Sequence, residues 1–199
     1  MDKVIIYILH ISLVKDNLSF MSSFVNPTRK EKAERFVNKN DRLLSLGAGY
    51  LLKRYLPKGE IKEKEGGKPY LENGPFFNIS HSGDYVILGI HPSRDVGVDV
   101  ERINEQRLDS IKFVLNKEEA IDDMETLFRI WSNKESLVKC TSTGIGEIKM
   151  VNGLPLEGCR IIKNKEYYTK SMIYNNYSLS VTLIDKEPFE IDLRCIEAL

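Results

Sequence analysis

Two carboxylates lie two residues apart in the stretch VGVDVER, residues 96–102. Its alternating pattern predicts a β-strand with the valines on one face and Asp99 and Glu101 on the other. Their side chains would stand about 6–7 Å apart along the strand, so that both could reach one hard cation such as Mg²⁺. A solvated edge strand with an acidic face explains the same pattern, and on this stretch alone it is the simpler interpretation.

A helix carrying a third carboxylate is predicted over FRIWSNKESLVK, residues 128–139. Trp131, Glu135 and Lys139 are four residues apart and therefore share one helix face. Glu135 and Lys139 could be an ordinary helical ion pair, but the only tryptophan of the chain lies on the same stripe and indicates a partly buried face. A buried glutamate needs a partner, and a cation shared with the two strand carboxylates would provide one. The two serines of this segment fit ordinary surface positions.

Basic residues with the character of a phosphate-binding group occur in two further places. Arg29 and Lys32 are three residues apart on an expected helix of mixed charge and could hold one phosphate together, although such a helix is normally a solvated face. Lys68 lies in the segment GGKPY, where a surface loop is an equally good explanation.

The polar stretch NISHSGDY, residues 78–85, separates two apolar runs. Gly83 and Asp84 would make a turn, but a turn does not require Ser80 or His81. A hydrogen-bonded loop histidine is the simpler interpretation of His81 by itself. An imidazole flanked by serine hydroxyls would also suit the oxygens of a phosphate.

The strands that would frame these residues are predicted from apolar runs and from alternation. The expected strands cover residues 4–9, 76–80, 85–91, 96–102, 147–151, 159–163, 167–174 and 177–184. Asn175 and Asn176 tolerate a left-handed backbone and predict a tight turn between the last two strands. Residues 58–75 are polar and contain several glycines and prolines, so an irregular connection is expected there.

Helices are predicted from their capping signals. Thr28, with a glutamate three residues later, forms a capping box that would begin the basic helix. Asp41 would cap a second helix that Pro57 ends, and Asn116 would cap the first of two helices within residues 117–140.

The order of these elements predicts an α+β fold. Each half of the chain runs from a strand through helices to a hairpin, which is compatible with a duplicated unit although the two halves match weakly in sequence. The expected halves are residues 1–102, with the metal-binding strand, and 103–199, with the WSNKESLVK helix.

Composition limits the class of protein. The chain has 199 residues, 42% of them hydrophobic, and its 29 basic and 29 acidic residues leave no net charge, which disfavours a general nucleic-acid binder. Its three cysteines are too far apart for a CxxC pair and indicate a reducing, cytoplasmic compartment. The first apolar run, residues 4–9, is too short to span a membrane and lacks a signal-peptide cleavage site, so no membrane partner is expected.

Taken together and in order, GKPY, FNISHS, VGVDVE and WSNKESLVK make the chain resemble the 4′-phosphopantetheinyl transferases, specifically the monomeric surfactin-synthetase-activating type. The resemblance extends from SFVNPTRKEKAERF to the C-terminal hairpin. It implies two similar α/β halves with pseudo-twofold symmetry and coenzyme A in the cleft between them. It also implies Mg²⁺-dependent transfer of phosphopantetheine to a serine of an apo acyl or peptidyl carrier protein, with release of 3′,5′-ADP, by a monomeric enzyme.

The same resemblance assigns roles to single residues. It implies Asp99, Glu101 and Glu135 as ligands of Mg²⁺, with Mn²⁺ as an alternative because both ions accept oxygen ligands. Glu135 is the expected base, and Lys139 is expected to stabilise the departing phosphate. The residues that it implies for coenzyme A binding are Arg29, Lys32, Gly67, Lys68, Pro69, Ser80, His81 and Lys139.

The chain departs from the family pattern in the second predicted helix, where many relatives have an arginine at the position of Leu44 and Arg42 is the nearby substitute. Two other functions would use the same residues. One is a Mg²⁺-dependent hydrolase that cleaves a phosphoanhydride with water, and the other is a non-catalytic module that binds coenzyme A or a carrier protein. The motifs do not indicate which carrier protein is the partner.

Overall fold

The computed structural model describes residues 2–64, 66–119 and 121–199. Glu65 lies outside the described residues, within the expected connection, and Ala120 likewise, within the segment predicted as helical.

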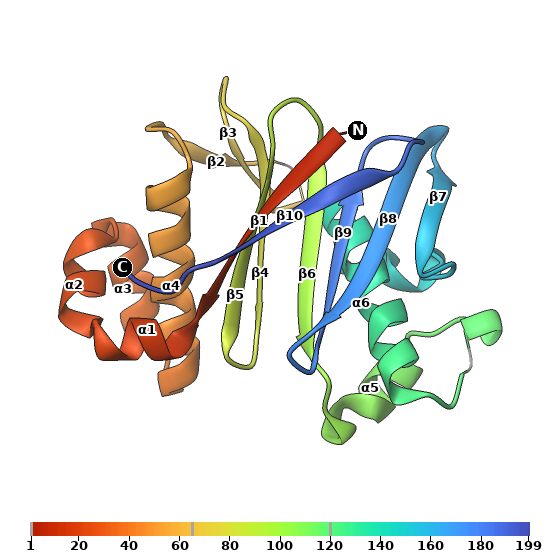
Figure 1. Ribbon diagram of the computed structural model, residues 1–199, viewed down its shortest axis with the longest axis horizontal. Coiled ribbons are helices and arrows are strands. Elements are labelled where there is room, and N and C mark those ends of the chain that lie inside the picture. The colour runs from red at the N-terminus through yellow and green to blue at the C-terminus, as the bar shows by residue number, and fades with distance from the viewer. Residues whose placement is uncertain (1, 65, 120) are drawn as a thin grey trace.

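The first part of the chain folds into a strand, a group of helices and four further strands (Figure 1). Its helices, which follow strand β1 (Asp2–His10), are α1 (Ile11–Asp16), α2 (Leu18–Phe24), α3 (Pro27–Glu34) and α4 (Lys39–Tyr55). The strands after α4 are β2 (Ile61–Glu63), β3 (Pro69–Leu71), β4 (Phe76–Ser82) and β5 (Tyr85–His91).

The second part begins with strand β6 (Val96–Arg102) and again continues into helices and strands. Its helical elements are η1 (Glu105–Arg107), α5 (Leu108–Lys112), η2 (Lys117–Glu119), α6 (Met124–Thr141) and η3 (Ile145–Met150), where η denotes a 3₁₀ turn. The remaining strands are β7 (Glu157–Ile162), β8 (Lys165–Tyr174), β9 (Tyr177–Leu183) and β10 (Phe189–Cys195).

Two sheets have the strand orders β10-β1-β5-β4 and β6-β9-β8-β7. In both, the strand that precedes the helices pairs antiparallel with the second strand of a hairpin: β1 with β5, and β6 with β9. This repeated connectivity agrees with the strand-helix-hairpin recurrence in the sequence and with the expected α+β class.

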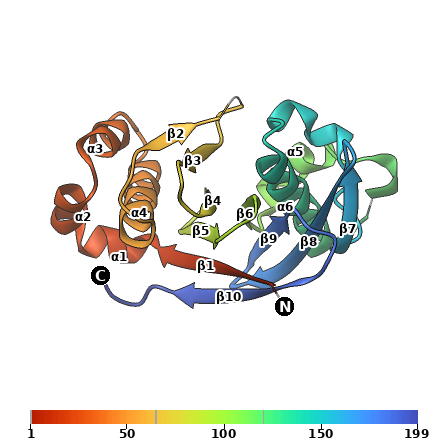
Figure 2. The same cartoon turned by 90° about the horizontal axis from the view of Figure 1, so that it is seen from above.

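The sheet pairing crosses the expected division at residue 102 in two places. Strand β6 pairs with β9 of the second sheet, and β10 returns to the first sheet as the parallel neighbour of β1. Figure 2 shows β1 and β10 running side by side from one part of the molecule to the other. The two parts are therefore interlocked through hydrogen-bonded strands.

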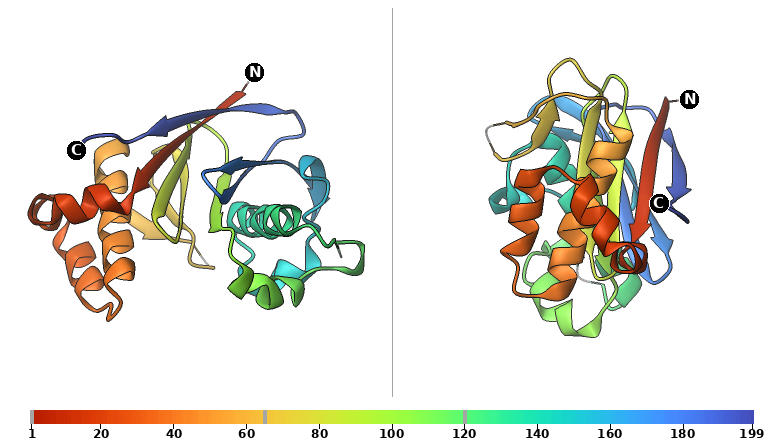
Figure 3. Two further views of the ribbon diagram at one scale, coloured as in Figure 1. Left: turned by 60° about the horizontal axis from the view of Figure 1, so that its bottom comes forward. Right: turned by 90° about the vertical axis from the view of Figure 1, so that its left-hand side faces the viewer.

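Apolar side chains form one layer between the two sheets and another beneath the first group of helices. Alternate residues of β1, β5, β6 and β9, among them Ile6, Ile87, Val98 and Val181, fill the layer between the sheets. Helices α1 and α4 pack on the outer face of the first sheet, α2 and α3 pack against α4, and α6 covers the outer face of the second sheet (Figure 3). No helix within the described residues is both long and apolar enough to cross a membrane.

Most predicted strands are confirmed, and the turn at Asn175 and Asn176 has the expected positive φ angles of 46° and 63°. The strand predicted over residues 147–151 is wrong, because residues 147–150 belong to η3 and Val151 directly follows it. Ile148 and Val151 are buried while the residues between them are exposed, and a three-residue spacing suits a 3₁₀ turn. The connection expected over residues 58–75 contains the hairpin β2–β3.

Two of the predicted helix caps are displaced, by two and three residues. Asn26 Oδ1 accepts from Arg29 N at 2.7 Å and caps α3, Asn38 caps α4, and Asp123 caps α6. Thr28 and Asp41 are therefore not the caps of α3 and α4. Asn116, expected to cap the first of two helices, directly precedes η2, and its backbone carbonyl accepts from Glu119 N. Asparagine and aspartate cap as well as the residues that were favoured, and proline suits the first helical position of α3.

Candidate functional site

Strand β6 holds two of the three predicted carboxylates. Val96, Val98 and Val100 pack in the layer between the sheets, so alternation turns Asp99 and Glu101 to the opposite face, toward α6. The face assignment made from the sequence is thus confirmed. Both carboxylates are buried rather than solvated.

Gly97 allows α6 to approach this strand closely. A Cβ atom at Gly97 would overlap the carbonyl oxygen of Ser136 and the backbone nitrogen of Cys140. Only glycine permits such close packing, and it brings the face with Glu135 and Lys139 to the carboxylates of β6.

The surface of α6 that contacts the second sheet is polar. Ser132 Oγ lies 2.5 Å from Ser178 Oγ and 2.7 Å from Ser180 Oγ, and Ser136 Oγ lies 2.8 Å from Thr182 Oγ1. All five side chains are fully buried. The expectation that the two serines of α6 lie on the surface is wrong, because each hydroxyl finds a partner across the interface and can be buried without losing a hydrogen bond.

The polar residues of NISHS connect the edge strands β4 and β6, which are not paired through their backbones. Side chains at alternate positions of β4 accept hydrogen bonds from backbone amides of β6. The pairs are Val98 N with Asn78 Oδ1 (2.9 Å), Val100 N with Ser80 Oγ (3.4 Å) and Arg102 N with Ser82 Oγ (3.2 Å). These side-chain hydrogen bonds replace the backbone pairing that adjacent strands normally make. They explain why alternate residues of this stretch are polar.

Asp99 has one oxygen bonded and one without a partner. Its Oδ1 accepts from Ser80 Oγ at 2.9 Å and from Lys139 Nζ at 2.5 Å. Its Oδ2 is buried and has no hydrogen-bond partner within the described part of the chain, although the residue is only 2% exposed. A buried carboxylate oxygen left in this way indicates a place for a further positive charge.

Glu101 is held by three donors. Trp131 Nε1 donates to Oε1 at 3.2 Å, Ser82 Oγ donates to Oε2 at 2.7 Å, and Arg107 Nη1 also contacts Oε2. Burial and the nearby Asp99 carboxylate raise the pKa of Glu101 despite these donors.

Glu135 and Lys139 complete the cluster. Burial, followed by the charges of Asp99 and Glu101, raises the pKa of Glu135 to about 7, although Lys139 Nζ lies 3.5 Å from its Oε2. Burial disfavours the charged form of Lys139, but Asp99 and Glu135 outweigh it and raise its pKa. The site thus contains more carboxylates than ammonium groups in a poorly hydrated space.

Among the described residues, no three His, Cys, Asp or Glu side chains converge closely enough to hold a metal ion as they stand. Lys139 contacts Asp99, and Arg107 contacts Glu101, so a cationic side chain already lies against each of these carboxylates. The open Oδ2 of Asp99, the carboxylate donors and the raised pKa of Glu135 together fit a hard divalent cation.

Ser80 and His81, predicted to share a phosphate, extend to opposite sides of β4. Ser80 is buried and bonded to both Asp99 and Lys139. His81 is exposed on the other side, where partial desolvation and then the Lys139 charge lower its pKa, while Asp41 of α4 acts in the opposite direction. The imidazole therefore lies at the rim of the site.

Arg29 and Lys32 lie on α3, apart from the carboxylate cluster. Arg29 is half-buried, with its stem against Gly49 of α4, and burial lowers its pKa. Lys32 is exposed. Leu44 belongs to the apolar core beneath α4 and cannot contact a phosphate there.

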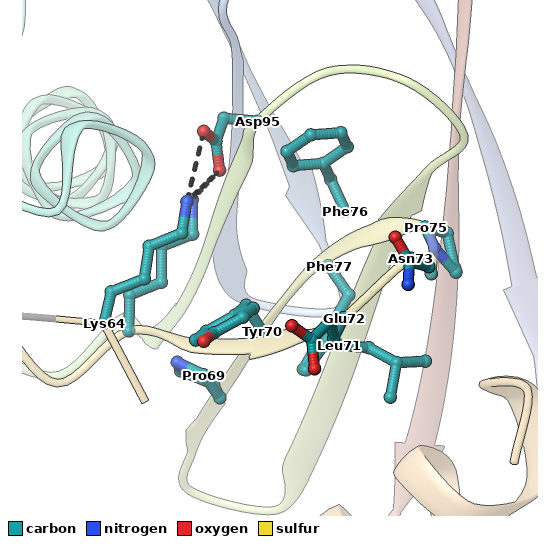
Figure 4. A pocket seen from close by; sticks show the side chains of 12 residues that line it. Lys64, Pro69, Tyr70, Leu71, Glu72, Asn73, Pro75, Phe76, Phe77 and Asp95 are labelled. Atoms are coloured by element: carbon teal, nitrogen blue, oxygen red, sulfur yellow. Dashed lines mark hydrogen bonds and ion pairs between the residues drawn. The ribbon is translucent and has the colours of Figure 1, made fainter. Parts of the chain in front are cut away.

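Residues of the GKPY segment connect the β2–β3 hairpin to the end of α6. Lys68 is buried, and its Nζ donates to Asp95 Oδ1 at 3.0 Å and to Cys140 O at 3.2 Å, at the C-terminal end of α6. Gly67 has a φ of 81° and makes the tight turn before it. Pro69 lines a cavity of about 340 Å³ at the β2–β3 hairpin, with Tyr70 among the other lining residues (Figure 4).

Several residues around the site are not indicated by the motifs of the sequence. Arg107 gave no signal, because its partner Glu101 is reached only through the turn η1. Lys134, within WSNKESLVK, is fully buried and pairs with Glu119 at 2.7 Å, which ties α6 to the preceding segment. The spacing of Asn78 with the two serines that follow it was a usable signal, since alternate polar residues share one strand face.

Two family models match adjacent parts of the chain. The model described as 4′-phosphopantetheinyl transferase, N-terminal, matches residues 13–93, and the model described as the 4′-phosphopantetheinyl transferase superfamily matches residues 95–183. The matched regions meet just before β6, at the hairpin-to-strand connection.

Curated relatives carry the same description. The chain is 30% identical over 191 residues to 4′-phosphopantetheinyl transferase gsp of Aneurinibacillus migulanus, covering 86% of this chain and 75% of the relative. It is 33% identical over 149 residues to 4′-phosphopantetheinyl transferase Sfp of Bacillus subtilis, covering 66% of each. It is 28% identical over 157 residues to 4′-phosphopantetheinyl transferase HetI of Nostoc, covering 70% of this chain and 64% of the relative.

Proposed function

This chain belongs to the 4′-phosphopantetheinyl transferase superfamily, and we propose that it transfers the phosphopantetheine arm of coenzyme A to a serine of an acyl or peptidyl carrier protein. The serine oxygen forms a bond to the phosphorus that bears the pantetheine. The diphosphate bond of coenzyme A breaks, 3′,5′-ADP leaves with the bridging oxygen, and the serine proton passes to a base of the enzyme.

Asp99, Glu101 and Glu135 are the proposed ligands of Mg²⁺, with Mn²⁺ as an alternative. The observation that carries this proposal is the buried Oδ2 of Asp99, which lacks a hydrogen-bond partner among the described residues and lies in a cluster of three carboxylates. When bound, the ion would neutralise the diphosphate and stabilise charge on the departing oxygen.

Glu135 is the proposed general base. Burial and the neighbouring carboxylates raise its pKa to about 7, so the side chain is a stronger base than an ordinary glutamate. Lys139 lies beside Glu135 and is the proposed cation that stabilises the leaving phosphate.

Two of the residues assigned to coenzyme A have different proposed roles. Ser80, which is 6% exposed, positions Asp99 and Lys139 through its hydroxyl rather than lying free for a ligand. Lys68 is engaged by Asp95 and by α6, so it supports the loop. His81, Arg29 and Lys32 remain the proposed contacts for the phosphates of coenzyme A.

Intact-protein mass spectrometry tests the transfer directly. An apo acyl carrier protein and an apo peptidyl carrier domain would each be incubated with the protein, coenzyme A and Mg²⁺, with EDTA and serine-to-alanine carriers as matched controls. We expect a metal-dependent gain of one phosphopantetheine group on at least one carrier, and none on its alanine variant.

The products distinguish the two alternatives. Free 4′-phosphopantetheine without any change in carrier mass would identify a hydrolase. Coenzyme A binding without any product would identify a non-catalytic binding module. Either result would contradict the proposed transfer.

A further inference from the structure

We propose that Arg107 is a built-in competitor of the metal ion, which holds Glu101 while the site is free of metal and must leave that carboxylate when the ion binds. This inference rests on the proposed metal site. It concerns a residue outside the motifs that identify the family, located in the turn η1 that follows β6.

The hydrogen bonds of Glu101 show why one donor must leave. A carboxylate has about four acceptor positions on its two oxygens. Both positions on Oε2 are taken, by Ser82 and Arg107, and Trp131 takes one of the two positions on Oε1. Asp99, by contrast, already has an open oxygen. An ion that takes Oε2 of Glu101 must therefore displace one of its two donors, whereas Oδ2 of Asp99 can accept an ion without losing a donor.

Arg107 is the donor that can leave with the smallest rearrangement. Trp131 is packed between two apolar clusters, and Ser82 is fixed by its position on β4 and by the amide of Arg102. The Arg107 side chain is 42% exposed, while its backbone stays bonded to Asn104 O. Rotation of this one side chain into solvent would free Glu101 Oε2.

The balance of charge favours the exchange. Glu101 is only 11% exposed, so an unpaired negative charge there is unfavourable and Arg107 stabilises the metal-free site. A divalent ion at the same carboxylates carries twice the charge of the guanidinium and contacts several carboxylates at once. The ion should therefore displace Arg107 from Glu101. Because the ion pair between Arg107 and Glu101 is lost in this exchange, the affinity of the protein for the ion is lower than it would be without Arg107.

Arg102 provides a matched control. It adjoins Glu101 in sequence and carries the same charge, but its guanidinium lies 3.5 Å from Asp84 and is 53% exposed. Replacing either arginine by glutamine removes one positive charge near the site. Only Arg107→Gln removes the contact with Glu101.

Mn²⁺ binding, followed by electron paramagnetic resonance of the free ion, is the decisive measurement. We expect Arg107→Gln to bind Mn²⁺ about three- to fivefold more tightly than the wild type, the upper part of the range for loss of an exposed ion pair, and Arg102→Gln to change the affinity less than about twofold. In thermal unfolding, Arg107→Gln should be less stable than the wild type in EDTA, and the difference should shrink at saturating Mn²⁺.

The outcomes separate this inference from the proposed function. Equal affinity of Arg107→Gln and Arg102→Gln, or weaker binding by Arg107→Gln, would overturn the competitor role while leaving the metal site intact. Absence of Mn²⁺ binding by the wild type and by both variants would overturn the metal site and the competitor role together.

Discussion

At the level of single residues, three carboxylates are paired with only two cationic side chains. Lys139 forms ion pairs with Asp99 and Glu135, and Arg107 forms an ion pair with Glu101. The shortage of positive charge is concentrated at Glu135, whose pKa rises to about 7, and at the open oxygen of Asp99. The same shortage of positive charge would attract a divalent ion, and an ion bound to Glu135 would in turn favour its ionised form.

Replacing Glu135 by glutamine should lower the rate of carrier modification by about 10²–10⁴-fold, the range for loss of a general base, while largely preserving coenzyme A binding. The carrier assay and calorimetric titration with coenzyme A measure the two effects. Glu125→Gln, on the exposed first turn of the same helix, is the matched control. Turnover that survives in Glu135→Gln would place the base elsewhere.

The same variant has a predicted pH signature in metal-free buffer. The pKa of Glu135 rises from 4.5 to about 7 on folding, so its contribution to stability is present at low pH and is lost as the pH rises through that interval. Glutamine does not ionise, so Glu135→Gln avoids this loss of stability. Its free energy of unfolding should exceed that of the wild type by about 1–3 kcal/mol at pH 8, and this difference should decrease toward pH 4.5. Urea unfolding in EDTA at several pH values measures it, and a gain independent of pH would contradict this explanation.

At the level of elements, the position of α6 on β6 sets the geometry of the site. Buried hydroxyl pairs fix the rotation of the helix on the second sheet, and Gly97 fixes its distance from the strand. Lys68 donates a hydrogen bond to the carbonyl oxygen of Cys140, which attaches the end of α6 to the β2–β3 hairpin. Each of these contacts affects Glu135 and Lys139 indirectly, because it sets the position of the helix that carries them.

Gly97→Ala should therefore impair stability and activity together. The added methyl group overlaps the backbone of α6, which we expect to destabilise the fold by about 2–3 kcal/mol. A displacement of the helix by about 1 Å would lower carrier modification by about 10²-fold. Gly146→Ala is the control, because a Cβ there meets open space. Wild-type stability and activity in Gly97→Ala would show that the helix does not depend on this close approach.

At the level of the whole molecule, two connections join the parts that the sequence presents as halves. One is the ladder of β4 side chains on the amides of β6, and the other is β10, which leaves the second part and pairs with β1. Phe189 at the start of β10 is buried in the layer between the sheets and contacts Tyr168 of β8. The candidate site lies across the first of these connections, so it requires both parts.

The two parts should consequently unfold in one transition. Urea unfolding followed by the fluorescence of Trp131, which lies in the second part, should coincide with unfolding followed by far-ultraviolet circular dichroism. Phe189→Ala should lower both midpoints together, with a loss of about 3–5 kcal/mol, whereas Phe113→Ala, at an exposed position, should have little effect. Separate transitions for the two probes would mean that the halves are independent.

The sequence alone determined the chemistry-bearing elements. Alternation placed Asp99 and Glu101 on one face of β6, and the four-residue period placed Trp131, Glu135 and Lys139 on one stripe of α6. These are local properties of the backbone, which is why they could be predicted. Together with the ordered motifs they were sufficient to indicate the family.

Only the tertiary structure decided which partners those residues have. The pairing of β10 with β1, the contact between Arg107 and Glu101, and the burial of Lys68 against α6 all join segments that no local pattern relates. The same is true of the buried serines of α6, which look like surface residues until their hydroxyl partners on β9 are known. Long-range packing sets burial, and burial in turn sets the charge balance from which the chemistry of this site follows.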